Sequence, residues 1–274
     1  MTAIKTGLKK ILEKTATESL GKRAHFKFKK LQHFLKNQQF KKNNPSLAIP
    51  PDEYLFETFQ LDYQKYFADG NLAAKEILDW TREYIPEEMP TILDWGCGTG
   101  RITQHLHHYN PYALLYGADI NQKMIEWNHR NINDVYFSNI ATVTPTDYPA
   151  NYFDLVYGIS VFTHLPSIIQ INWLDELSRI LKPSGILLIS THGSYFFSQL
   201  LRKEINQLDK NGFFEKVFHK NNQIQSGDRN YTMYMTADHF KKLIEQQFSI
   251  KSFYEGLDHP EKIGGQDLWI LQKK

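Results

Sequence analysis

The spacing of apolar residues changes near residue 91 and separates two patterns along the chain. In the first pattern, apolar residues such as Ile4 and Leu8, or Phe28 and Leu31, recur at intervals of three or four residues. This spacing predicts helices. In the second pattern, short apolar runs alternate with amphipathic stretches. That alternation predicts a doubly wound, Rossmann-like α/β fold, in which helices cover both faces of a mostly parallel sheet.

Glycine and proline divide the helical part further. Gly21 is expected to separate two helices within the first 45 residues, and the stretch from Lys41 to Pro45 is expected to be a linker. Residues 52–85 are predicted to form one or two helices, interrupted near Asp69 and Gly70. The sheet therefore follows a helical N-terminal region.

The second pattern predicts the following elements. The expected strands are residues 91–95, 112–119, 135–138, 153–160, 185–191, 250–256 and 267–272. The expected helices are residues 99–109, 122–131, 166–181, 195–210 and 236–248. Asn121 and Thr236 precede two of these helices and are predicted to be their N-caps. Residues 211–235 show no clear pattern.

The net charge of +2 conceals two oppositely charged parts. Residues 1–45 contain twelve Lys or Arg and two Glu, a net charge of +10, and the rest of the chain carries −8. The basic segment is expected to be a solvated extension. Peripheral contact with a membrane, with a protein or with nucleic acid remains an alternative. The acidic remainder argues against a nucleic-acid substrate, because such a binding face needs a basic patch.

Length and composition are those of a globular protein. The chain has 274 residues, of which 41% are hydrophobic, enough for one large domain with additions. The single cysteine, Cys97, excludes an internal disulfide and favours a reducing compartment. No apolar run approaches the roughly 18 residues of a membrane span, and the N-terminus has no signal-peptide core. A cytoplasmic protein is expected, with the inner membrane surface as a second location.

A strand that leads into a glycine-rich turn is the strongest chemical signal. Glycines let the backbone turn sharply and approach a ligand closely, and ligands bind at the carboxyl ends of parallel strands. Arg101 stands where a dinucleotide fingerprint has its third glycine, which counts against a pyrophosphate. The residues of this turn expected to bind a cofactor are Gly96, Cys97, Gly98, Gly100 and Arg101.

An acidic residue follows the next predicted strand at the spacing expected for a ribose contact. Asp119 lies about 20 residues beyond the glycine loop, where a carboxylate can accept hydrogen bonds from both ribose hydroxyls. Ile120 is expected to cover one face of the adenine. This pair indicates a nucleoside cofactor, but it does not distinguish a methyl donor from a nicotinamide.

Four motifs, in order, resemble those of class I S-adenosylmethionine-dependent methyltransferases: residues 92–101, 117–120, 152–165 and 174–189. The resemblance covers residues 91–192. It implies a seven-stranded sheet with one antiparallel strand and S-adenosyl-L-methionine as the cofactor. The further cofactor contacts that it implies are Asp94, which with Gly96 would lie near the methionine part, Ser138, Asn139 and Ile140 beside the adenine, and Gly158, Ile159 and Ser160 beneath the sulfonium.

The expected layout is a basic helical extension at 1–45, a helical lid at 46–90 and a methyltransferase domain at 91–274. An insertion at about 194–235 is expected to shape the acceptor site. Tyr66 and Phe67 of the lid, and Arg229 and Tyr231 of the insertion, are the candidate substrate contacts. The alternatives are ordinary helix packing for the first pair and a structural cover for the second.

His192 and His164 follow predicted strands and are the candidate catalytic residues. Either can act as a general base if the acceptor must lose a proton; the alternative is that they fill space. His105, His107 and His108 are expected on a solvated helix face, and no metal is expected.

These residues predict methyl transfer by direct displacement to an oxygen or nitrogen of a small-molecule or glycan-like acceptor. A NAD-dependent oxidoreductase and a non-catalytic cofactor-binding scaffold, tethered by its basic N-terminus, are the alternatives. A nucleic-acid methyltransferase that uses the basic segment is a third.

Overall fold

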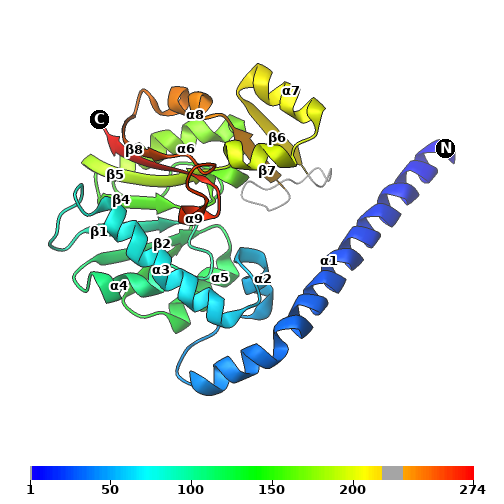
Figure 1. Ribbon diagram of the computed structural model, residues 1–274, viewed down its shortest axis with the longest axis horizontal. Helices are drawn as coiled ribbons and strands as arrows, with labels where there is room; N and C mark the ends of the chain where they lie inside the picture. The colour runs from blue at the N-terminus through cyan, green and yellow to red at the C-terminus, as the bar shows by residue number, and fades with distance from the viewer. Residues whose placement is uncertain (1, 218–230) are drawn as a thin grey trace. The chain divides into compact units, whose positions relative to one another are not determined.

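The computed structural model describes residues 2–217 and 231–274 (Figure 1). Contacts divide the chain into two compact units, residues 1–70 and 71–274. The boundary falls inside the helix α3 (Tyr63–Thr81), between the boundaries at 45 and 90 that the sequence suggested. No helix among the described residues is long and apolar enough to cross a membrane.

The first unit consists of α1 (Thr2–Asn43), α2 (Asp52–Thr58) and the beginning of α3. The predicted division at Gly21 is wrong, because α1 continues through it. A single helical glycine costs only about 1 kcal/mol, and its neighbours sustain the helix. The predicted interruption at Asp69 and Gly70 is also wrong, because α3 includes both residues. The helical conformation is interrupted at residues 59–62 instead, between α2 and α3.

Aromatic side chains form the core of the first unit. Leu55 of α2 and Tyr66 of α3 are fully buried. The ring of Phe40, from α1, stacks on that of Phe67 at 5.5 Å between centroids. The second half of α1 is therefore fixed to α2 and α3 by apolar packing.

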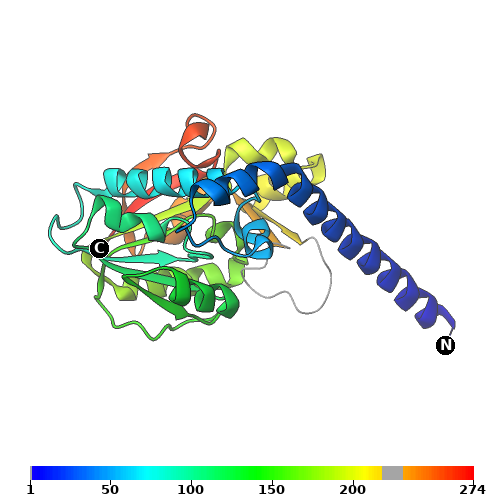
Figure 2. The same cartoon turned by 90° about the horizontal axis from the view of Figure 1, so that it is seen from below.

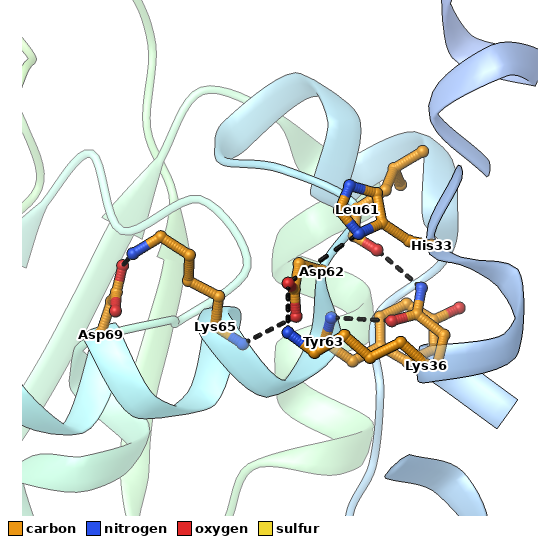
Figure 3. Close-up of polar contacts among 8 residues, drawn as sticks. His33, Lys36, Leu61, Asp62, Tyr63, Lys65 and Asp69 are labelled. Carbon is orange, nitrogen blue, oxygen red and sulfur yellow. Dashed lines mark hydrogen bonds and ion pairs between the residues drawn. The ribbon is translucent and has the colours of Figure 1, made fainter. Parts of the chain in front are cut away.

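Polar contacts around Asp62 reinforce this packing (Figure 3). Asp62 Oδ1 accepts a hydrogen bond from the Lys65 amide at 3.0 Å and caps the start of α3. Its other oxygen accepts from Lys36 Nζ of α1 at 2.7 Å. Burial alone would raise the pKa of Asp62, but the bonds from Lys36 and Lys65 outweigh it and hold the pKa below its usual range.

A seven-stranded sheet forms the second unit (Figure 1). Its order is β3-β2-β1-β4-β5-β9-β8. The five strands from β3 to β5 are parallel, and β9 runs antiparallel to both of its neighbours. The strands are β1 (Thr91–Trp95), β2 (Leu114–Asp119), β3 (Val135–Asn139), β4 (Phe153–Gly158), β5 (Leu181–Thr191), β8 (Phe248–Tyr254) and β9 (Asp267–Lys273). The expected fold class, including the single antiparallel strand, is confirmed.

Two apolar layers cover the two faces of this sheet, because successive side chains of a strand point to opposite faces. On β9, Leu268 and Ile270 belong to the layer that includes α3, whereas Trp269 and Leu271 belong to the layer that includes α6 (Ser167–Ile180) and α8 (Ala237–Ile244). The other helices are α4 (Leu106–Tyr109), α5 (Gln122–Asn131), α7 (Arg202–Asn211) and α9 (Pro260–Ile263), with 3₁₀ turns η1 (Thr103–His105), η2 (Phe162–His164) and η3 (Ser194–Gln199). Figure 2 shows helices on both sides of the sheet.

The N-cap residues were predicted correctly from the sequence, but the bounds of two helices were not. The predicted caps are confirmed, since Asn121 accepts hydrogen bonds from the Lys123 and Met124 amides, and Thr236 accepts one from the His239 amide. The helix expected at 99–109 is wrong in its first part, because residues 99–102 form a turn. The 3₁₀ turn η1 and the helix α4 follow it. The helix expected at 195–210 is divided into η3 and α7.

A strand pair occupies the region in which no element was predicted. The strands β6 (Phe213–Val217) and β7 (Tyr231–Met235) pair antiparallel in a separate two-stranded sheet. All five β7 residues are buried, so an alternating polar pattern is absent. This explains why apolar spacing did not reveal the strand.

Candidate active site

The glycine loop after β1 adopts a backbone that other residues rarely tolerate. Gly96, Gly98 and Gly100 have φ angles of +83°, +53° and +68°. A Cβ on Gly96 would also lie 2.4 Å from the Val161 side chain. Glycine is therefore required at this turn both for its conformation and for space.

Backbone hydrogen bonds tie this loop to the end of β2. The carbonyl of Ala118 accepts from the amides of Gly96 at 2.7 Å and Cys97 at 3.0 Å. Asp119 Oδ2 accepts from the Gly98 amide at 2.8 Å, and Oδ1 accepts from the Asn121 amide at 2.8 Å. A carboxylate has about four lone-pair positions, so Asp119 can still accept hydrogen bonds from a ligand. The two predicted cofactor segments thus form one connected cradle.

Asp94 lies beneath the loop as a buried acid. Its Oδ2 accepts a hydrogen bond from the Thr103 hydroxyl at 2.5 Å. Burial raises the pKa of Asp94 to about 6, although Thr103 and the charge of Arg101 lower it. Burial also raises the pKa of the Cys97 thiol, which packs with Ile125 and Phe137. A neutral, buried thiol fits a packing role.

The end of β3 lies beside Asp119. Ser138 and Asn139 pair in register with Ala118 and Asp119. The Asn139 side-chain amide and the Ile140 backbone amide both donate to the Asp119 carbonyl, at 3.0 and 3.1 Å. Ile120 keeps 37% of its surface exposed at the same edge. These residues are therefore gathered where an adenine was predicted to bind.

The loop after β4 approaches the glycine loop from the other side. A Cβ on Gly158 would lie 2.7 Å from the Trp95 ring, so β4 reaches β1 closely only because this residue is glycine. Ile159 is half-buried, and Ser160 has a φ of +63°, in the left-handed region. Such a backbone in a residue other than glycine costs on the order of 1–3 kcal/mol.

The two candidate catalytic histidines lie against β7. His164 Nδ1 is 2.8 Å from the Tyr231 carbonyl, so this nitrogen carries the proton. The His192 ring lies 5.6 Å from that of Tyr234, and His192 Nδ1 is buried without a hydrogen-bond partner. Burial, with a smaller effect from His164, lowers the pKa of His192 to about 4. His192 is therefore neutral near pH 7 and a weak base. In the described ranges, no group of three or more His, Cys, Asp or Glu side chains could hold a metal ion.

Comparison with known proteins identifies a methyltransferase domain within the chain. Residues 93–189 match the family model for a methyltransferase domain. A malonyl-[acyl-carrier protein] O-methyltransferase from Halalkalibacterium halodurans is 30% identical over 46% of this chain and 47% of the relative. A trans-aconitate 2-methyltransferase from Variovorax paradoxus is 30% identical over 46% of this chain and 47% of the relative. The crystal structure of a SAM-dependent methyltransferase from Methanosarcina mazei aligns with a TM-score of 0.53 at 20% identity, over 71% of this chain and 96% of that chain. Residues 93–189 therefore belong to the methyltransferase-domain family, and the chain shares its fold with a SAM-dependent methyltransferase of known structure, as the resemblance to class I S-adenosylmethionine-dependent methyltransferases implies.

The family assignment confirms the predicted cofactor class, S-adenosylmethionine, and disfavours the oxidoreductase alternative. The chain spans about half the length of the curated relatives it matches. At 20% identity, the solved structure supports the fold alone.

The candidate substrate contacts lie in three places. Tyr66 and Phe67 are buried in the aromatic core of the first unit. Tyr231 begins β7 and is buried in the layer around α6 and α8. Arg229 lies outside the described residues. Their substrate roles stay predictions.

Sequence reasoning missed the polar residues that precede and begin β9. Gln266 bonds to Ser160 and Ser190, and the buried Asp267 accepts from the Gly256 amide at 2.8 Å. Because β9 is antiparallel, its first residue pairs with Thr191, the last residue of β5. The start of β9 is thereby placed among the carboxyl ends of the parallel strands. The antiparallel strand that the family resemblance implies was the signal that could have indicated this.

Proposed function

We propose that this protein transfers the methyl group of S-adenosylmethionine to an oxygen or nitrogen of a small-molecule or glycan-like acceptor. The observation that carries this proposal is the cradle in which the Gly98 amide bonds to the Asp119 carboxylate. A turn without Cβ atoms and a carboxylate with spare lone pairs fit a nucleoside that lacks phosphates.

The donor, when bound, supplies a methyl carbon activated by a cationic sulfur. The task of the chain is to align the acceptor with that carbon, and alignment can contribute roughly 7–11 kcal/mol. Asp119 would hold the ribose, the glycine loop would lie along the methionine part, and Gly158–Ser160 would form the floor. No metal-binding group is needed for this work.

Within this class of acceptors, we propose a carboxyl oxygen as the first candidate. The two relatives named above are a malonyl and a trans-aconitate methyltransferase, and both of those substrates carry carboxyl groups. A carboxylate is already deprotonated at neutral pH and needs no general base. This suits His192, whose pKa of about 4 makes it a poor base. If the acceptor is a carboxylate, the proposed role of His192 is a hydrogen bond to the acceptor rather than removal of a proton.

The direct test is to titrate the protein with S-adenosylmethionine and, separately, with NADH by calorimetry. We expect binding of the first and not of the second. Transfer of a labelled methyl group is then measured on a panel of carboxylic acids, hydroxyl compounds and amines. NADH binding without S-adenosylmethionine binding would overturn the proposal, and transfer only to hydroxyl compounds or amines would overturn the carboxyl assignment.

We also propose that α1 lies on an anionic membrane surface. Residues 21–43 contain eight Lys or Arg and no acidic residue. On the side of α1 away from Phe40, the side chains of Phe28, Leu31 and Leu35 are 63%, 75% and 80% exposed. Their i, i+3, i+7 spacing places them on one face. Exposed apolar side chains among lysines are typical of a helix at a lipid interface.

Replacing Phe28, Leu31 and Leu35 together with serine should lower binding to phosphatidylserine-containing vesicles by at least about tenfold, since each buried side chain contributes roughly 1.5–3 kcal/mol. Vesicle co-sedimentation measures this. The matched control is the triple serine variant of Ile168, Ile171 and Leu257, three exposed apolar residues of the second unit. Equal binding by both variants, or a wild type that self-associates through this face and ignores vesicles, would exclude the membrane.

A further inference from the structure

Three side chains from distant parts of the sequence form a closed ring of hydrogen bonds at the candidate active site. The Ser160 amide donates to Ser190 Oγ at 2.8 Å. The Ser190 hydroxyl donates to Gln266 Oε1 at 2.7 Å. Gln266 Nε2 then donates back to Ser160 Oγ at 2.7 Å. The ring connects the loop after β4, the end of β5 and the residue before β9.

This ring surrounds the strained residue of the site. Ser160 has a φ of +63°, a conformation that residues other than glycine adopt at a cost. The ring engages its amide and its hydroxyl, and its carbonyl accepts from the Thr163 hydroxyl at 2.6 Å. All the polar groups of Ser160 are thereby held. Strain of this kind persists only where the surrounding structure determines the conformation.

The ring uses both ends of the side-chain amide of Gln266. Its oxygen accepts the bond from Ser190, and its nitrogen donates the bond to Ser160. Leucine can do neither, and an ionised glutamate can only accept, so it keeps the contact with Ser160 only if the Ser160 hydroxyl turns to donate. Ser190 is fully buried, so it cannot exchange a lost partner for water without movement.

We propose that Gln266 is a positioning residue of the methyl-donor site. It acts through Ser160, by holding the loop of Gly158 to Ser160 in the left-handed conformation that forms the floor beneath the donor. This inference rests on the proposed function. It assigns a role to a residue more than 100 positions away from the loop that it controls.

Calorimetric titration of Gln266→Leu and Gln266→Glu with S-adenosylmethionine and S-adenosylhomocysteine tests the proposal. We expect Gln266→Leu to bind these ligands about tenfold more weakly, because two hydrogen bonds are lost, and Gln266→Glu to bind them with an intermediate affinity. The matched control is Gln272→Leu on β9, where the Gln272 side chain donates to the Ser184 carbonyl at 3.1 Å. Gln272 pairs with Ile186 in the middle of β5, five residues before Thr191 at the site, so the ligand affinity of this variant should stay at the wild-type value.

A second pair of variants separates positioning from general stability. Ser160→Gly removes the cost of the left-handed backbone and keeps the amide that donates to Ser190. In that background, Gln266→Leu should change the affinity by much less than tenfold, which is the non-additivity expected of residues that act together. Equal loss in both backgrounds, or a lowered Tm of Gln266→Leu with unchanged affinity, would overturn the positioning role. A wild type that binds neither ligand would overturn the proposed function and this inference together.

Discussion

Replacing Asp119 with alanine should weaken the binding of S-adenosylmethionine by at least about a hundredfold, because hydrogen bonds to a charged group are worth roughly 1.5–3 kcal/mol each and, in the proposed binding mode, two ribose hydroxyls would lose their acceptor. The substitution also releases the Gly98 and Asn121 amides, which fix the glycine loop at the end of β2. Both effects act in the same direction. The dissociation constant from calorimetry is the measurement.

Two further variants make this expectation specific. Asp119→Asn keeps the shape and one acceptor oxygen, so its affinity should lie between those of the wild type and the alanine variant. Asp209→Asn removes an exposed carboxylate of α7 and should bind as the wild type does. Thermal unfolding without ligand checks that each variant is folded. A folded Asp119→Ala protein with near wild-type affinity would contradict the ribose assignment.

Elements with local signals could be predicted from the sequence almost to the residue. The strand Thr91–Trp95 and the helix Gln122–Asn131 have the predicted bounds, because an apolar run and an Asn121 cap determine them. The positions of glycines predicted the ends of helices less well. Gly21 and Gly70 lie inside helices, since one unfavourable residue in a long helix is offset by its neighbours and by packing.

Elements that depend on tertiary contacts were harder to predict. β7 is buried throughout, so its sequence lacks the alternation by which a half-buried strand is recognised. The turn at residues 99–102 contains residues compatible with a helix, but the loop is held by its bonds to Ala118 and Asp119 rather than by its own propensity.

The residues of the candidate site also fall into those that a local sequence signal indicates and those that only the tertiary structure brings together. The glycine loop and Asp119 could be named as candidates because one short segment contains the turn and the acid follows it at a characteristic spacing. Gln266 lies 76 residues from Ser190 and 106 from Ser160, and only the antiparallel placement of β9 brings the three together. His192 could be named from its position after a strand, but the burial that lowers its pKa is a property of the fold.

Asp154 shows how a motif residue can act on stability rather than on chemistry. It belongs to the motif around β4 by which the family resemblance was drawn, yet it lies at the opposite end of the sheet from the site. Its Oδ2 accepts from the Thr91 amide at the start of β1 and from Lys182 Nζ of β5, both at 2.8 Å. One buried carboxylate thus joins the three central strands.

Asp154→Ala should lower the free energy of unfolding by about 3 kcal/mol, because the buried Thr91 amide loses its acceptor and Lys182 loses its partner. For a chain of this size that corresponds to a Tm lower by roughly 10 °C. Lys182→Met, which removes only a half-exposed ion pair, should cost less than about 1 kcal/mol. Asp154→Asn retains an acceptor for Thr91 and should fall between the two. Thermal and urea unfolding measure the series, and equal losses for Lys182→Met and Asp154→Ala would show that the ion pair, rather than the Thr91 bond, provides the stabilisation.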